Sequence, residues 1–364
     1  MLEGAIVSEI EAVVRKLAPA SDEVDGALDK EVALLATRGW LRACLPTRWG
    51  GEGWGCEPAG AGDAFDALRS LGRANLSLAR LFEGHMNAVK LVVFYGSEEA
   101  GHGMAVAIAA GALLSVWGAD EPGDPLRFEH LGDALALKGT KRFASGLGVV
   151  SLAVVTAATE KDQQLLLVPA SRPDRFDLAA WSMGGMRATQ SGRYNFSGVQ
   201  TGVDALIGAP GDYPQEPHFE GGIWRYCAAH LGAAEALYDA MLIHLKDSDR
   251  AHDTNQQRRI VASAIAIETA RLWLLRAANE VETPGAEPEK AALSLLAREA
   301  TEDACRLVAE SVERALGMAA HIEGSFVHRT MRDLRLFLCQ AAPDAKRGRA
   351  AEVLITRSAR PEQL

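Results

Sequence analysis

The sequence has no excess of positive charge. Its 364 residues include 38 lysines and arginines against 48 acidic residues, which gives a formal net charge of −10 at pH 7. Proteins that bind the phosphate backbone of nucleic acids usually present a basic face, and no basic cluster is visible in this chain. We therefore expect no nucleic-acid partner.

Cysteine is scarce, and histidine shows no grouping typical of metal ligands. The five cysteines are scattered, with no CxxC pair and no histidine at zinc-ligand spacing: Cys44, Cys56, Cys227, Cys305 and Cys339. An odd, dispersed set is typical of reduced thiols in the cytoplasm. The nine histidines form no ligand cluster, so the sequence predicts no metal site.

Long apolar runs are also missing. The longest, such as residues 104–117, are rich in alanine and glycine and are too short to cross about 30 Å of hydrocarbon. The first residues lack the basic and apolar regions of an export signal. These observations predict a cytoplasmic protein that does not bind a membrane.

Several common catalytic signatures are absent. There is no GxxxxGK[ST] phosphate loop and no HExxH zinc motif. The residues around Ser145 do not form the GxSxG turn of a serine hydrolase, and the glycine-rich run at 50–55 lacks GxGxxG spacing. The sequence therefore offers no sign of a P-loop nucleotide-binding protein, an HExxH zinc enzyme or a serine hydrolase.

The residues that are present divide the chain into three parts. Apolar residues first recur at helical spacing at Leu2, Ile6, Ile10, Val13, Val14 and Leu17. This pattern predicts helices up to about residue 115, with one helix ending near Gly39 and another capped by Ser97. Residues 116–212 contain short β-rich runs between Gly, Pro and Asp turns, which is typical of a small antiparallel sheet or barrel.

Long helical patterns return after residue 218, with a break at 282–288. Two apolar lines lie side by side on one of these helices: Val261, Ile265, Leu272 and Leu275, and Ile260, Ile267 and Leu274. A helix that apolar lies inside a bundle or at an oligomer interface, so we expect a homodimer or homotetramer. The predicted fold class is α+β, with an N-terminal helical domain (1–115), a central small antiparallel β-domain (116–212) and a C-terminal four-helix-type bundle (218–364).

Four colinear motifs support a more specific interpretation: Trp117-Gly-Ala-Asp-Glu-Pro122, Leu137-Lys-Gly-Thr-Lys-Arg-Phe-Ala-Ser-Gly146, Gly185-Met-Arg-Ala-Thr189 and Met331-Arg-Asp333. Together with the helix, β, helix order and the early Trp-Gly-Gly-x-Gly loop, they resemble the acyl-CoA dehydrogenase superfamily of flavoproteins. The resemblance extends over almost the whole chain.

The resemblance implies an FAD held between the β-domain and the C-terminal bundle. It places Trp117 and Phe143 against the isoalloxazine ring and Ser145 near flavin N5 and O4. It places Asp120, where the family has Thr, at the flavin edge, and Arg250 at the diphosphate of a neighbouring subunit's FAD. The residues alone favour a different interpretation, with Trp117 and Phe143 as core aromatics and Ser145 as a turn residue.

The sequence departs from the family at the general base. Counting from Arg332-Asp333, the usual Glu position holds Ala341, which cannot accept a proton. Other members carry the base on the first C-terminal helix, where this chain has Gly222. Glu220 is a weak candidate, because it is two residues away and such a shift turns a side chain by about 200° on a helix. A helix-start carboxylate exposed to solvent is the favoured interpretation of Glu220.

Three functions follow from the resemblance. The first is an FAD-dependent oxidoreductase acting on an acyl-CoA or a similar small organic substrate. The second is a flavin-dependent monooxygenase of the same fold that uses reduced flavin and O₂ and needs no α-proton base. The third is a flavin-holding interaction protein with little catalysis.

Overall fold

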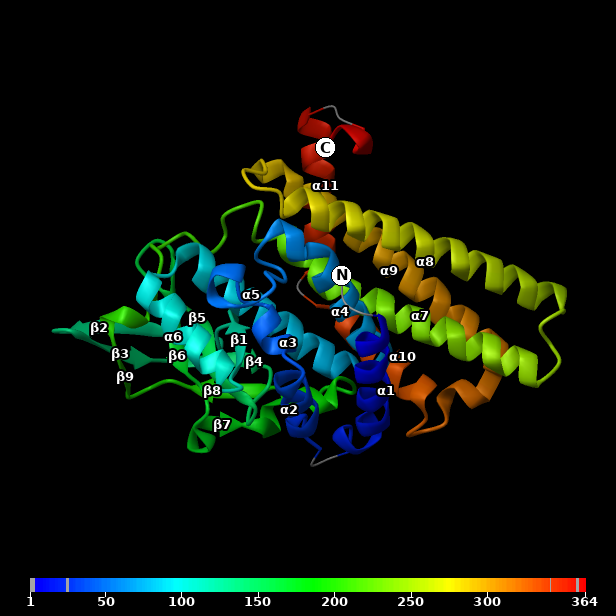
Figure 1. Ribbon diagram of the computed structural model, residues 1–364, viewed down its shortest axis with the longest axis horizontal. Helices are drawn as coiled ribbons and strands as arrows, with labels where there is room; N and C mark the ends of the chain where they lie inside the picture. Colours follow the sequence, from blue (N-terminus) through cyan, green and yellow to red (C-terminus); the bar gives the residue numbers. More distant parts are fainter. Residues whose placement is uncertain (1–3, 24–25, 341, 358–359) are drawn as a thin grey trace.

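Helix α5 (Leu76–Tyr95) connects the helical and β parts of the computed structural model (Figure 1). It contacts strand β1 (Leu113–Trp117), helix α4 (Ala61–Ala74) and helix α7 (Trp224–Asp247). The structure describes residues 4–23, 26–340, 342–357 and 360–364. Leu2 and Ala341, both singled out in the sequence, lie outside these ranges.

Four more helices complete the first part of the chain: α1 (Gly4–Ser21), α2 (Asp29–Thr37), α3 (Trp40–Ala43) and α6 (Glu98–Ala109). The predicted cap of α6 is confirmed, because Ser97 Oγ accepts a 3.1 Å hydrogen bond from the Ala100 amide. Ile10 and Val14 of α1 are buried as expected, whereas Val13 is 38% exposed because it lies beside the buried stripe.

The middle part holds the remaining strands: β2 (Arg127–Leu131), β3 (Ala134–Lys138), β4 (Thr140–Ala144), β5 (Val150–Ala158), β6 (Gln163–Pro169), β7 (Phe176–Asp177), β8 (Gly192–Asn195), β9 (Val199–Gly202) and β10 (Leu206–Ile207). They form three small sheets, ordered β1-β5-β6-β10, β2-β3-β9 and β4-β8-β7. Pairing is antiparallel except between β1 and β5, which are parallel. The antiparallel sheet expected from the sequence is thus mixed at this one pair.

The last part is helical, as predicted. It consists of α7, α8 (Thr254–Val281), α9 (Ala291–Leu316), α10 (Phe326–Leu338) and α11 (Pro343–Arg357). The long helices α7, α8 and α9 lie side by side and extend away from the β sheets (Figure 1). The break predicted at 282–288 is confirmed, because α8 ends at Val281 and α9 begins at Ala291.

Helix α8 buries neither of its two apolar lines completely, because Ile260, Ile267 and Leu275 are only half-buried. Leu274 is fully buried, whereas Val261, Ile265 and Leu272 are 57%, 64% and 55% exposed. The exposed line forms an apolar face on a single copy of the chain. None of the described helices combines the length and hydropathy that crossing a membrane requires.

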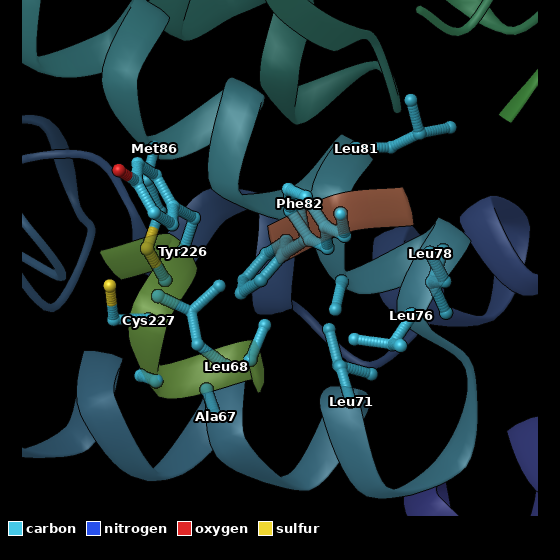
Figure 2. Packing of buried hydrophobic residues seen from close by; sticks show 14 of the residues in the cluster. Ala67, Leu68, Leu71, Leu76, Leu78, Leu81, Phe82, Met86, Tyr226 and Cys227 are labelled. Atoms are coloured by element: carbon cyan, nitrogen blue, oxygen red, sulfur yellow. The ribbon is translucent and has the colours of Figure 1, made fainter. Parts of the chain in front are cut away.

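The core joins α4, α5 and α7. Leu68 and Leu71 of α4 pack with Phe82 and Met86 of α5 near Tyr226 of α7 (Figure 2). Burying each such side chain contributes roughly 1.5–3 kcal/mol relative to exposure. This packing fixes α5, and with it the polar residues on its other face. The helix, β, helix order agrees with the sequence analysis, and the domain limits given there stay a prediction.

Candidate active site

Two adjoining cavities lie where the β sheets meet the helices. The first, of about 640 Å³, is the aromatic cavity, lined among others by Trp117, Phe143, Ser145, Trp181 and Phe337. The second, of about 330 Å³, is the charged cavity, lined among others by Arg80, Glu83, Lys90, His218 and Arg225. Both volumes fall in the range of small-molecule sites. The cavities share a wall made by Arg80, Val116, Gly118, Ala119 and Gln340.

Trp117 at the end of β1 holds one side of the aromatic cavity in place. Its ring is buried, packs 5.3 Å from the Tyr194 ring, and donates a 3.0 Å hydrogen bond from Nε1 to the Ser145 carbonyl. Ser145 Oγ lies 2.9 Å from Ser191 Oγ, also on the cavity wall. The structure therefore brings the predicted residues Trp117 and Ser145 together.

Phe143 lies on the same cavity in a strained conformation. Its φ is 54°, and the pairing of β4 with β8 is irregular at this position. A bulky residue at positive φ is uncommon and marks strain that often serves a functional site. The ring is 47% exposed and meets Trp181 edge-on, with centroids 6.3 Å apart. The apolar ring is therefore available to a ligand.

Two buried donors on the aromatic cavity have no hydrogen-bond partner among the described residues. They are Trp181 Nε1 and Arg142 Nε. A buried donor without a partner is costly, and a ligand that offers acceptor atoms would remove that cost. Flat aromatic walls, hydroxyls and unsatisfied donors fit the ring of a flavin, which is planar and has nitrogen and oxygen acceptors along its edge.

Asp120 and Arg250, the other residues that the resemblance implied for the cofactor, do not line this cavity. Asp120 accepts a 2.6 Å hydrogen bond from Lys141 Nζ and another from the Leu126 amide. Arg250 lies in the loop between α7 and α8, at the far end of the long helices (Figure 1), where Nη1 donates to the Ala315 carbonyl. Within one chain, the structure does not bring Asp120 or Arg250 to the aromatic cavity.

A polar stripe on α5 lines the charged cavity. Arg80, Glu83, Asn87 and Lys90 recur at helical spacing and face it together. Glu83 is buried, pairs with Arg80 at 2.6 Å and also accepts a hydrogen bond from Asn87 Nδ2. This stripe was not predicted from the sequence, although its four polar residues recur at helical spacing.

A buried ion cluster closes one end of the charged cavity. Glu282 follows α8, and its carboxylate lies 2.7 Å from Lys90 Nζ and 2.6 Å from Arg225 Nη2. Trp224 Nε1 donates a third hydrogen bond to it at 3.1 Å. Burial raises the pKa of Glu282, but the neighbouring Arg225 and Lys90 outweigh burial and bring the pKa below its ordinary value. The carboxylate is therefore ionised and fully partnered at neutral pH.

The candidate base Glu220 lines the charged cavity but is not free. It is buried and pairs with Arg349 and Lys346 of α11. Ala341, at the position where family members often carry the base, lies outside the described residues. Within the described ranges, both carboxylates on the charged cavity, Glu83 and Glu220, are thus held by cations. No described group of three or more His, Cys, Asp or Glu residues could hold a metal ion.

Comparisons with known proteins identify relatives of this chain. Residues 218–339 match the family model "Acyl-CoA dehydrogenase, C-terminal domain". A dibenzothiophene monooxygenase of Rhodococcus erythropolis is 28% identical over 209 residues, which cover 54% of this chain and 49% of that protein. The chain thus spans about half the length of the curated relatives it matches.

Two solved structures resemble the chain over nearly its whole length. Dibenzothiophene monooxygenase TdsC from Paenibacillus sp. A11-2, in complex with FMN and indole, has a TM-score of 0.83 at 21% identity, with 98% of this chain and 97% of that chain covered. Methanesulfinate monooxygenase MsuC from Pseudomonas fluorescens has a TM-score of 0.84 at 20% identity, with 99% and 98% covered. Residues 218–339 are thus similar to the C-terminal domain of acyl-CoA dehydrogenases, and the chain as a whole has the acyl-CoA dehydrogenase-like fold.

Proposed function

We propose that this protein is a flavin-dependent monooxygenase acting on a small organic molecule. The observation that carries the proposal is the pairing of the two cavities. One has flat walls and donors that suit a flavin ring, and the other adjoins it with both of its described carboxylates, Glu83 and Glu220, held by cations. A dehydrogenase of this fold needs a base for the substrate α-proton, whereas a monooxygenase does not. The sequence similarity to dibenzothiophene monooxygenases supports the same choice.

The residues of the aromatic cavity would hold the cofactor. Phe143 and Trp181 would cover the ring, and the Ser145 and Ser191 hydroxyls would meet its polar edge. We propose FMN as the cofactor in place of the FAD expected from the sequence, because FMN is the flavin named for the TdsC complex. When bound and reduced, a flavin supplies the electrons that activate O₂ for transfer of one oxygen atom to the substrate. The walls of both cavities would position the substrate and exclude water from this step.

Two parallel measurements test this function. The first titrates the purified protein with oxidised and reduced FMN and FAD and follows the quenching of tryptophan fluorescence. The second adds ¹⁸O₂ to protein loaded with reduced FMN and with dibenzothiophene or indole. The product is then analysed for one labelled oxygen atom. Binding of reduced flavin with label incorporation is the expected result. Failure to bind any flavin contradicts the proposal.

The dehydrogenase interpretation has its own readout. The family match over residues 218–339 keeps a CoA thioester among the substrates to be tested. If acyl-CoAs bleach the bound flavin without oxygen, the protein is a dehydrogenase and the base has been missed. Retained yellow colour with neither response would instead indicate a flavin-holding interaction protein.

We also propose that the chain forms a homodimer or homotetramer through the exposed face of α8. Val261, Ile265 and Leu272 stand on this face and are more than half exposed in a single copy. An apolar face of this kind on a long helix is typical of an interface between subunits. Such an assembly would also bring Arg250, near the start of α8, toward another subunit.

A further inference from the structure

The charged cavity carries more positive than negative charge. Its lining cations are Arg80, Lys90, Arg225 and Lys346. The carboxylates that pair with them are Glu83, Glu282 and Glu220, and Glu220 is also paired with Arg349. The excess is greatest at Glu282, where one carboxylate balances two buried cations.

Both cations of that cluster are almost inaccessible to water. Lys90 is 4% exposed and Arg225 is 1% exposed. Burial and the neighbouring Arg225 lower the pKa of Lys90 to about 8, opposed by Glu282, so the ammonium remains mainly protonated at pH 7. An uncompensated buried charge is costly, so an anion bound beside it would be strongly favoured.

Donor capacity is also left over at this end of the cavity. Arg225 Nε and His218 Nδ1 are buried and have no hydrogen-bond partner among the described residues. Lys90 Nζ, which carries three hydrogens, makes one hydrogen bond in the described part of the chain, to Glu282. Burial and the nearby Lys90 lower the pKa of His218 to about 4, so its ring is neutral and can donate from one nitrogen.

The geometry also orients a ligand. Arg80 lines both cavities, and Lys90 stands ten residues further along α5, about 15 Å along the helix axis. Leu91, Phe94 and Ile223 supply apolar wall beside the charged groups. A ligand with its charged end at Lys90 would direct its other end toward the shared wall and the aromatic cavity.

We infer that the charged cavity binds small organic molecules that carry an oxyanion, such as a carboxylate or sulfinate, at the end opposite the oxidised atom. Lys90 and Arg225 would hold the oxyanion, with His218 as an additional donor. The statement that the bound molecule is the one to be oxidised rests on the proposed function. The binding itself requires no flavin.

The test uses flavin-free full-length protein and two probes of nearly equal shape. Isothermal titration measures the affinity of 4-phenylbutanoate, an anion, and of the neutral 4-phenylbutanamide. We expect the acid to bind at least tenfold more tightly in the wild type. The same titrations are done on Lys90→Met, on Lys90→Arg, which retains the charge, and on Lys138→Met, which removes a lysine exposed on β3.

Loss of one buried, charge-assisted contact should weaken binding of the acid by about ten- to hundredfold in Lys90→Met. Lys90→Arg should recover part of that loss, and Lys138→Met should bind like the wild type. Equal binding of acid and amide, or no binding of either, would overturn the inference even if Lys90→Met failed to fold. Unchanged acid binding in a folded Lys90→Met would overturn the assigned position.

FMN uptake is measured on the same preparations. If the acid binds and FMN does not, the proposed monooxygenase function fails and the oxyanion site stands. If FMN binds and the acid does not, the oxyanion site fails and the proposed function stands.

Discussion

Arg225 Nη2 donates a 2.6 Å hydrogen bond to the backbone carbonyl of Gly55, 170 residues earlier in the chain. Gly55 has a φ of 75°, and a Cβ atom there would lie 3.0 Å from Arg225 Nε. The glycine-rich loop that follows the early helices therefore fixes a guanidinium that lines the charged cavity. A loop with no recognisable nucleotide motif thus has a defined structural role.

Replacing Gly55 with alanine should disturb both the loop and Arg225. A side chain at positive φ costs about 1–2 kcal/mol, and the close approach to Arg225 adds to that. We expect a lower urea midpoint and weaker binding of 4-phenylbutanoate. Gly103→Ala is the matched control, because Gly103 lies in α6 with no atom within 4 Å of its Cβ position. It should raise stability by up to about 1 kcal/mol. Equal effects of the two substitutions would contradict this account.

Phe143→Asn should distinguish the backbone strain at this position from the contact that its ring would make with a flavin. Asparagine tolerates positive φ better than phenylalanine, so the free energy of unfolding should stay the same or rise. Flavin affinity should fall about tenfold, because the apolar ring that would cover the isoalloxazine is lost. Fluorescence titration and urea unfolding measure the two quantities. Leu178→Asn, at another exposed apolar residue of the β region that does not line the cavity, should leave flavin affinity unchanged.

Asp120→Asn should lower the free energy of unfolding by more than it lowers the free energy of flavin binding. The side chain of Lys141 is fully buried and pairs with Asp120, so removing the carboxylate leaves a buried cation without its partner. Breaking such a pair costs about 3 kcal/mol or more. The double variant Asp120→Asn, Lys141→Met should recover part of the loss in urea unfolding. A large change in flavin affinity with unchanged stability would instead support the cofactor role that the resemblance implied.

His85 should make the fold sensitive to acid. Its Nδ1 accepts from the Leu114 amide and its Nε2 lies 2.9 Å from the Leu41 carbonyl, an arrangement that requires the neutral ring. Burial lowers the pKa of His85 to about 4, below its ordinary value near 6.5. The unfolded chain then binds more protons, so stability falls as pH decreases from about 6.5 to 4.

Titration of His85 alone should change the free energy of unfolding by up to about 1.4 kcal/mol per pH unit. His85→Gln can offer a donor and an acceptor without titrating, so the decline between pH 7.5 and 5 should be shallower in this variant. Urea unfolding at intervals of half a pH unit measures it. An identical pH profile in variant and wild type would show that His85 does not control acid stability.

The exposed face of α8 should control assembly. Ile265→Glu places a charge in the centre of the proposed interface and should shift a dimer or tetramer to monomers in size-exclusion chromatography with light scattering. Ile355→Glu on α11, where the side chain is 76% exposed, is the control and should not change the mass. A wild-type monomer would contradict the proposed assembly.

The sequence predicted much of the fold because local signals were strong. The Ser97 cap and the break at 282–288 are short-range features that side chains and turns dictate directly. The parallel pairing of β1 with β5 was not predicted, because alternation of apolar residues does not specify the direction of a partner strand.

The site was only partly predictable. Trp117, Phe143 and Ser145 were chosen through the family resemblance, and the structure places all three on one cavity. Of the charged cavity, the sequence pointed only to Glu220 and Gly222. The ion cluster was missed because it joins Lys90 to Glu282 across 192 residues. Burial decides whether such charges are a solvated surface or a binding site, and single-sequence patterns do not report it.

The wall between the two cavities includes Gly118 and Ala119, which follow β1, and Arg80 at the near end of the α5 stripe. Changes to residues at the distal end, around Lys90 and His218, would leave that partition in place. Under the proposed function, substrate preference would therefore diverge independently of the redox chemistry, and the distal end around Lys90 and His218 would be the place to re-engineer selectivity.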